Sequence, residues 1–123
     1  MNSKFYVSLE AARLLKEKGY NEETDYVIDG EVKELMRSWR TNEAIPEEFA
    51  DYFFSCPTKA EAIDWLDTKE IVVEISSVRN RKWRFSIYKN GWFQIDSWIH
   101  DRLDFPTRLE AEEAAIIKAL ELL

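Results

Sequence analysis

The sequence contains little cysteine, histidine, glycine and proline. Among 123 residues there are one Cys, one His, three Gly and three Pro. A single cysteine, Cys56, excludes an intramolecular disulfide and a cysteine-based zinc site, and a lone cysteine is typical of a reducing compartment. Three scattered glycines exclude a glycine-rich phosphate loop, and so little Gly and Pro argues against a disordered or repetitive chain.

Long apolar runs are missing as well. No stretch of about 18 apolar residues occurs, so we expect no membrane span. The residues after Met1 lack the apolar segment of a secretory signal, so we expect no signal peptide. Together with the single thiol, these absences predict a cytoplasmic protein.

The charge is mostly of one sign, because 24 acidic residues against 17 basic ones give a net charge of −7. An acidic chain repels phosphate backbones, which makes nucleic acid an unfavoured partner. Four cations do lie close together, at Arg79, Arg81, Lys82 and Arg84. We interpret them as a solvated hairpin loop, with nucleic-acid binding as the alternative.

Hydrophobic residues are plentiful, at 46% of the chain with five Trp, five Tyr and seven Phe. Large aromatic side chains provide enough apolar area for a core without a metal or a disulfide. The length fits one domain. We therefore predict a single α+β domain over residues 1–123.

Three helices are indicated by their ends. Ser8 is a good N-cap and Gly19 a good stop for a helix over about residues 9–18. Two later segments, 57–62 and 106–111, share the pattern Pro-Thr-X-X-Glu-Ala, which is typical of a capping box. Each copy follows a candidate strand, which suggests a duplication of a β-β-α unit.

Residues 20–56 are less regular. Asp29-Gly30 between two apolar segments favours a two-residue hairpin turn. Val32, Leu35, Met36 and Trp39 also follow helical spacing, so an amphipathic helix is the alternative, and we favour the hairpin. Residues 41–56 are predicted to be a connection, in which Pro46 starts a short helix.

Residues 71–98 contain three alternating runs, which predict a three-stranded antiparallel meander. The runs are 71–76, 83–88 and 92–98. A three-residue loop at 79–81 would pair Ile75 with Phe85. A three-residue loop at 89–91, with Gly91 in a bulge, would pair Ile87 with Phe93 and keep one face apolar, whereas a two-residue turn would put polar residues on that face.

The predicted fold is α+β, a mostly antiparallel sheet made of a hairpin plus the meander, with helices packed on one face. The last helix is apolar around most of its circumference, since residues 114–123 contain only Lys118 and Glu121 as charges. Such a helix is buried on several sides or forms a homodimer. Monomer and homodimer both stay open.

The second face of the meander is the predicted binding site. This face would carry aromatic and polar side chains: Val72, Glu74, Arg84, Tyr88, Trp92, Gln94, Asp96 and Trp98. Within it, the candidate binding residues are Tyr88, Trp92, Trp98 and Arg84, because aromatic residues and Arg are typical of interface hot spots. The alternative is a second core layer, with this face covered by the 26–39 hairpin or by a helix.

No catalytic or metal-binding constellation is present. His100 has no partners for a triad and is interpreted as a surface-loop residue. Cys56 is interpreted as a buried structural thiol rather than a nucleophile. The acidic groups at 22–23, 47–48 and 110–113 lack the spacing of a cation loop. We therefore predict no cofactor and no metal.

The chain resembles a family of small uncharacterised proteins from gut Bacteroidetes and their phages and mobile elements. The resemblance rests on Tyr6-Val7-Ser8-Leu9-Glu10, on 14–20, on Pro57-Thr58 and 62–66, and on the closing 110–111 and 118–121 segments. Residues 31–55 depart from the pattern by being longer and more acidic. The resemblance implies a Tyr-rich hairpin near residues 26–39 and an accessory role, and it brings no catalytic residues.

These observations predict a small, non-enzymatic protein-interaction or accessory protein, of phage or mobile-element origin, with an unknown protein as its partner. The alternative is a small-molecule-binding domain or minor enzyme with a pocket between sheet and helices, using Cys56, His100 or the acids.

Overall fold

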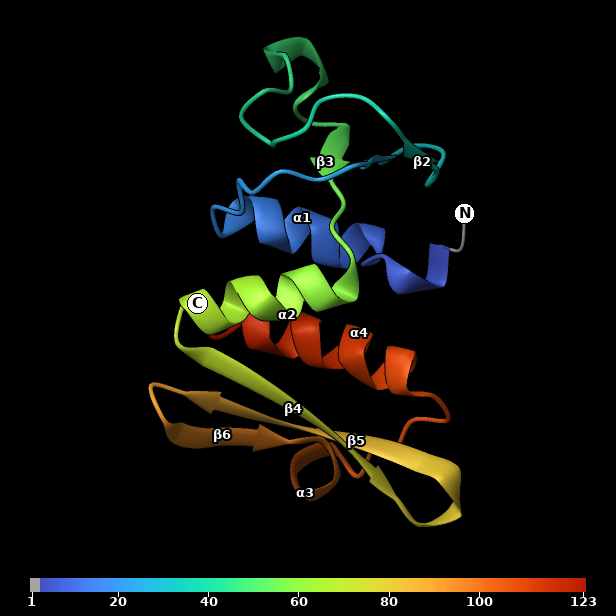
Figure 1. The fold of residues 1–123 in the computed structure, drawn as a ribbon, viewed down its shortest axis with the longest axis vertical. Helices are drawn as coiled ribbons and strands as arrows, with labels where there is room; N and C mark the ends of the chain where they lie inside the picture. The colour runs from blue at the N-terminus through green and yellow to red at the C-terminus, as the bar shows by residue number, and fades with distance from the viewer. Residues whose placement is uncertain (1–2) are drawn as a thin grey trace. The chain divides into compact units, whose positions relative to one another are not determined.

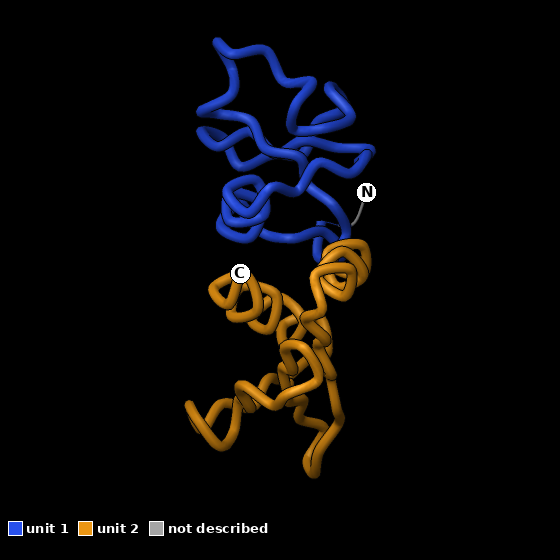
Figure 2. The backbone as a smooth tube through the Cα atoms, turned by 90° about the vertical axis from the view of Figure 1, so that its left-hand side faces the viewer, with its two compact units in different colours: residues 1–58 blue, residues 59–123 orange. Residues whose placement is uncertain are grey.

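The computed structural model describes residues 3–123, and the chain divides into two compact units after Thr58 (Figure 2). The sequence predicted one domain over residues 1–123, whereas each unit of the structure has a three-stranded sheet of its own. Both sheets are antiparallel and both units contain helices, so the predicted α+β fold is confirmed.

The first unit combines helix α1 (Leu9–Glu17) with strands β1 (Val27–Asp29), β2 (Leu35–Met36) and β3 (Phe53–Ser55) in the order β2-β1-β3. Short 3-10 helices cover Ser3–Phe5 and Glu47–Phe49. Helix α1 has the predicted ends: the Ser8 side chain accepts a hydrogen bond from the Ala11 N–H at 3.1 Å, and Gly19 has a φ of +92°.

The predicted hairpin is present, but its turn is longer than two residues. Val27 pairs with Met36 and Ile28 with Leu35, so the loop runs from Gly30 to Glu34. The Asp29 carboxylate accepts a hydrogen bond from the Glu31 N–H at 2.8 Å, and Lys33 has a φ of +59°, which together make the wider turn.

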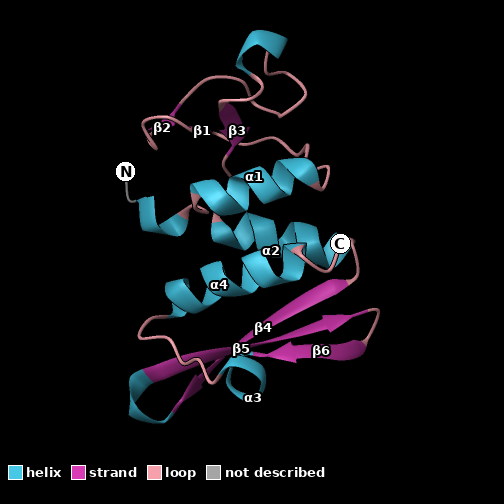
Figure 3. Ribbon diagram, turned by 180° about the vertical axis from the view of Figure 1, so that it is seen from behind, coloured by secondary structure: helices cyan, strands magenta, loops and turns pink. Residues whose placement is uncertain are grey.

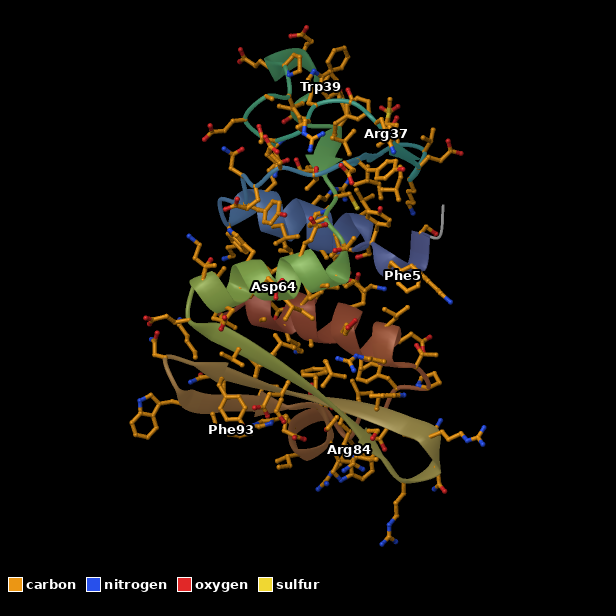
Figure 4. The ribbon with its side chains drawn as sticks, in the orientation of Figure 1. Phe5, Arg37, Trp39, Asp64, Arg84 and Phe93 are labelled. Carbon is orange, nitrogen blue, oxygen red and sulfur yellow. The ribbon has the colours of Figure 1, made fainter. Side chains whose placement is uncertain are left out.

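Strand β3 was missed, because the sequence predicted only a connection over 41–56. It pairs with β1 through Ile28 and Phe54. Phe53, also in β3, belongs to an aromatic cluster with Trp39 and Phe49, with ring centroids 5.5–5.8 Å apart. Trp39 is labelled in Figure 4. The short helix after Pro46 is confirmed as a 3-10 turn, Glu47–Phe49.

The second unit contains α2 (Lys59–Thr68), β4 (Ile71–Val78), β5 (Lys82–Lys89), β6 (Trp92–Asp96), α3 (Ser97–Asp101) and α4 (Arg108–Leu120). Strands β4, β5 and β6 form the predicted meander. Helices α2 and α4 cover one face of this sheet, the inner face, and α3 lies on the opposite, outer face (Figures 1 and 3).

The core of the second unit lies between the inner face and the two helices. The fully buried side chains there come from both layers: Leu66, Ile71, Phe85, Ile87, Ala115, Ile116, Ala119 and Leu120. The first hairpin register is confirmed, because Ile75 pairs with Phe85 and Val73 with Ile87. Helix α4 therefore uses its wide apolar surface within the unit.

The predicted register of the second hairpin is wrong. Lys89 pairs with Trp92 and Tyr88 with Phe93, so Asn90-Gly91 is a two-residue turn with positive φ at both positions. A bulge then shifts the register at Gln94, and Ile87 pairs with Ile95. The extra residue, Gln94, therefore lies within β6 and not in the loop, where the sequence predicted it. Because of this bulge, Ile95 again faces the inner side of the sheet.

The last predicted strand also ends early, because Ser97 and Trp98 belong to α3. The Asp96 carboxylate caps this helix by accepting from the N–H groups of Trp98 and Ile99 at 2.9 and 3.0 Å. His100 is thus a helix residue and not a loop residue. In chain order each Pro-Thr helix follows a three-stranded antiparallel sheet, although the strand orders differ, β2-β1-β3 and β4-β5-β6, and both helices belong to the second unit. The suggested duplication stays a prediction.

Candidate functional site

The outer face carries a row of apolar and aromatic side chains that runs across all three strands. Val72 of β4 pairs with Tyr88 of β5, and Tyr88 pairs with Phe93 of β6. The Tyr88 and Phe93 rings meet edge to face at 5.9 Å, and the His100 ring of α3 lies 5.9 Å beyond Phe93. Val72 is 41% exposed and Phe93 48% exposed. We call these four residues the aromatic row.

Polar residues hold α3 in place beside this row. The Ser86 hydroxyl donates to Asp96 at 2.9 Å, and the His100 Nδ1 lies 3.0 Å from the Asp96 backbone nitrogen. Burial alone would raise the pKa of Asp96, but hydrogen bonds from the Ile99 N–H, the Ser86 hydroxyl and the Trp98 N–H hold that pKa below its usual range. The ionised carboxylate of Asp96 therefore links the outer face to α3, because it accepts hydrogen bonds from Ser86 and from the first turn of the helix.

Arg84 and Trp98, two of the predicted site residues, contact each other. The Arg84 guanidinium lies 4.5 Å from the centroid of the Trp98 ring, and the Arg102 guanidinium lies 5.5 Å from it. Arg84 also forms an ion pair with Asp104, and it projects from β5 on the side where α3 lies (Figure 4). The hydrogen bond to Asp104 raises the pKa of Arg84 further above its usual value. This end of the outer face is partly covered by α3.

Trp92 is not on the outer face, contrary to the prediction. It pairs with Lys89, whose ammonium donates to the Leu122 carbonyl just beyond α4, so both residues belong to the inner side of the sheet. Trp92 is 76% exposed at the end of β6. The structure therefore brings together Tyr88, Arg84 and Trp98 on the outer face and leaves Trp92 apart from them.

Three further exposed apolar residues of the second unit were not predicted as site residues from the sequence: Phe93, Ile99 and Leu103. Phe93 was assigned to the inner face because the wrong loop length was chosen. Ile99 was missed because α3 was not predicted, although an Asp before Ser97 is a typical N-cap signal.

The basic segment lies at the tip of the first hairpin. Arg79, Lys82 and Arg84 line a shallow open cavity of about 580 Å³ together with Val78, Asn80 and Asp104. Asn80 and Arg81 have φ values of +64° and +58°. Residues 75–95 contain five Lys or Arg and no Asp or Glu, so this segment is locally positive within an acidic chain.

The other chemically notable residues, Cys56 and His100, belong to different units. Cys56 of the first unit is fully buried, and its thiol donates to the Val7 carbonyl at 3.3 Å. His100 of the second unit is exposed. Within residues 3–123, no group of three or more His, Cys, Asp or Glu side chains is arranged to hold a metal ion.

Among the same residues, no helix combines the length and the apolarity that a membrane crossing requires. Comparisons with models of protein families, with curated proteins and with solved structures give no match for this chain.

Proposed function

We propose that this protein is a non-enzymatic accessory protein that binds another protein through the outer face of its second sheet. The observation that carries the proposal is the exposure of the aromatic row together with Ile99 and Leu103. Clustered exposed apolar side chains with a polar rim mark protein interaction sites, because their burial removes apolar surface from water. The predicted phage or mobile-element origin remains a prediction.

The geometry of the row favours binding at a low entropic cost. Phe93 is held between Tyr88 and His100, and Trp98 lies against two guanidinium groups, so these rings already have fixed positions. Rings ordered before binding lose little conformational freedom when a partner covers them. Phe93, which contacts both Tyr88 and His100 and is 48% exposed, is therefore the expected anchor.

The proposal can be tested with one variant and a matched control. Phe93→Asp places a charge in the aromatic row, while Trp92→Asp places the same charge on a more exposed neighbour that lies on the other side of the sheet. Each tagged variant and the wild type would be used to capture partners from a lysate of the source cells. A captured protein would then be purified and its dissociation constant measured.

We expect Phe93→Asp to weaken the purified complex by roughly 30-fold or more, as is typical for loss of a buried aromatic anchor, and Trp92→Asp to leave it nearly unchanged. Equal binding by all three proteins, or equal loss in both variants, would contradict a site on the outer face. Circular dichroism of each variant would verify that the fold is retained.

A second candidate function is the binding of single-stranded nucleic acid, and one observation favours it. Four cations of the first hairpin, Arg79, Arg81, Lys82 and Arg84, belong to the same unit as the exposed Phe93 ring, and cationic grooves with aromatic rings bind unpaired bases. Titration of a labelled mixed-sequence oligonucleotide at low ionic strength would test it. Binding that weakens with salt and on Arg79→Glu would support this candidate, and absence of binding would exclude it.

A further inference from the structure

The exposed edges of the sheets differ in how well they are protected. An edge strand presents unpaired N–H and C=O groups, which pair readily with another strand unless the edge is short, bulged, charged or covered. In the second unit, β6 is five residues long, contains the bulge at Gln94 and runs directly into α3. Beyond β6 the same edge is covered by Phe105, which exchanges two backbone hydrogen bonds with Trp83 at 2.8 and 2.9 Å.

The sheet of the first unit is protected too. Strand β2 has only two residues. The outer edge of β3 is capped by side chains: Asn42 accepts from the Ser55 N–H at 2.9 Å, and the Lys16 ammonium donates to the Phe53 carbonyl at 3.4 Å. The Ser55 N–H and the Phe53 carbonyl, two backbone groups of β3 that point away from β1, therefore have side-chain partners.

Strand β4 lacks these protections. It has eight residues, with no Pro, Lys or Arg, and Glu74 is its one charged residue. The direction of its backbone groups follows from the neighbouring strand. Trp83 bonds to Phe105 on its far side, so Ser77, which is opposite Trp83, turns its own N–H and C=O away from β5.

The same alternation applies along the strand, so four residues present backbone groups at the open edge: Ile71, Val73, Ile75 and Ser77. Among residues 3–123, no backbone hydrogen bond joins Val73, Ile75 or Ser77 to any segment on the open side of β4. The side chains of Val73 and Ile75 are only half-buried, while their partners on β5, Ile87 and Phe85, are 0% and 1% exposed. A further strand at this edge would form hydrogen bonds with the open backbone groups of β4. It would also bury more of the Val73 and Ile75 side chains on the inner face.

We propose that the occupant is a second copy of this chain, with the two β4 strands paired antiparallel about a two-fold axis at Ile75. Ile75 then pairs with its own copy, and Val73 pairs with Ser77. On the outer side Val72 meets Val78, and Glu74 meets Ser76, whose hydroxyl can donate to the carboxylate. The β4 sequence is thus complementary to itself in this register, with no like charges opposed.

Two alternative symmetric registers are poorer. An axis at Glu74 places two carboxylates directly opposite each other, which is destabilising. An axis at Val73 aligns only residues 71–75 of each strand and leaves Ser77 without a partner. The Ile75 axis aligns 72–78 of both copies, so it satisfies more backbone groups. The proposal concerns the edge and not the outer face, and so it stands independently of the proposed function.

The oligomeric state of the full chain tests the proposal. Light scattering coupled to size-exclusion chromatography should give twice the mass of one chain, shifting toward the single mass on dilution. Ser77→Pro removes an N–H from the edge in each copy, and Ser77→Ala keeps it. We expect Ser77→Pro to raise the dimer dissociation constant roughly 30-fold, as the loss of two symmetry-related hydrogen bonds implies, and Ser77→Ala to have little effect.

Cysteine pairing tests the register and remains valid if Ser77→Pro fails to fold. Residues 74 and 76 of opposite copies form a pair without mutual hydrogen bonds, about 4.5 Å apart between Cα atoms, which is within disulfide range. An oxidised mixture of Glu74→Cys and Ser76→Cys proteins should form a covalent dimer, while each variant alone and the wild type with Cys56 should not. A single-chain mass up to near-millimolar concentration, or dimers of Glu74→Cys alone, would overturn the proposal.

Discussion

The side-chain amide of Asn42 joins two backbone segments of the first unit. Its Oδ1 accepts a hydrogen bond from the Ser55 N–H at 2.9 Å, and its Nδ2 donates to the Tyr20 carbonyl at 2.8 Å. Asn42 is buried, so water cannot replace either bond. A polar side chain in this position ties the start of the 41–56 segment to β3 and to Tyr20 just after α1, and it protects the edge of β3.

Asn42→Ala should therefore destabilise the protein by about 2–4 kcal/mol, because it leaves one buried donor and one buried acceptor without partners. The control is Asn21→Ala, which removes a hydrogen bond from the exposed Glu43 N–H and should cost less than about 1 kcal/mol. Urea unfolding monitored by circular dichroism measures both changes. Similar losses for the two variants would contradict the structural role assigned to Asn42.

The helices and the meander could be predicted from the sequence because their signals are local. Ser8 and Gly19 mark α1, and alternation marks the strands of the meander. The turn at Gly30 could not be predicted in the same way. Asp-Gly is typical of a two-residue turn, but Gly30 donates to the Tyr52 carbonyl at 2.6 Å, and this approach of β3 depends on a segment 22 residues further along the chain.

Gly30→Ala should destabilise the first unit by about 1–3 kcal/mol, the usual cost of an overpacked position. A Cβ atom at Gly30 would lie 2.9 Å from the Tyr52 carbonyl oxygen, which belongs to the backbone and cannot rotate away. Gly91→Asn is the control, because the site has open space and Asn tolerates its positive φ of 82°. Thermal unfolding of the two variants should show a clear loss only for Gly30→Ala.

The candidate site was harder to predict because it depends on one extra residue. A three-residue loop and a two-residue turn followed by a bulge both return Ile95 to the inner face, so hydrophobic alternation does not distinguish them. They differ in where Trp92 and Phe93 lie. The preference of Asn90-Gly91 for a two-residue turn was the available local signal, and it would have placed Phe93 beside Tyr88.

The capping role of Asp96 gives the stability of the protein a defined pH dependence. The pKa of Asp96 is lower in the folded state than in the unfolded chain, so its contribution is present above the unfolded pKa and is lost as the pH falls through the folded pKa. Asp96→Asn keeps a capping oxygen but does not titrate. At neutral pH the wild type should be more stable than this variant by about 1 kcal/mol.

The difference between wild type and Asp96→Asn should shrink as the pH falls below about 4, the ordinary pKa of an Asp carboxyl in the unfolded chain, because the unfolded state then gains a proton before the folded state does. Denaturant unfolding of both proteins at neutral and acidic pH measures it. A difference that stays constant with pH would show that the Asp96 charge does not stabilise α3.

Tryptophan exposure tests the register of β6 most directly. Trp92 is 76% exposed and Trp65 is 6% exposed, while Trp98 is partly covered by the guanidinium groups of Arg84 and Arg102. Iodide quenches only accessible rings, so Trp92→Phe should lower the quenchable fraction of the fluorescence and shift the remaining emission to the blue. Trp65→Phe removes a buried ring, so it should raise the quenchable fraction. Trp98→Phe should have a smaller effect than Trp92→Phe, and the reverse order would mean that Trp92 and not Trp98 is covered.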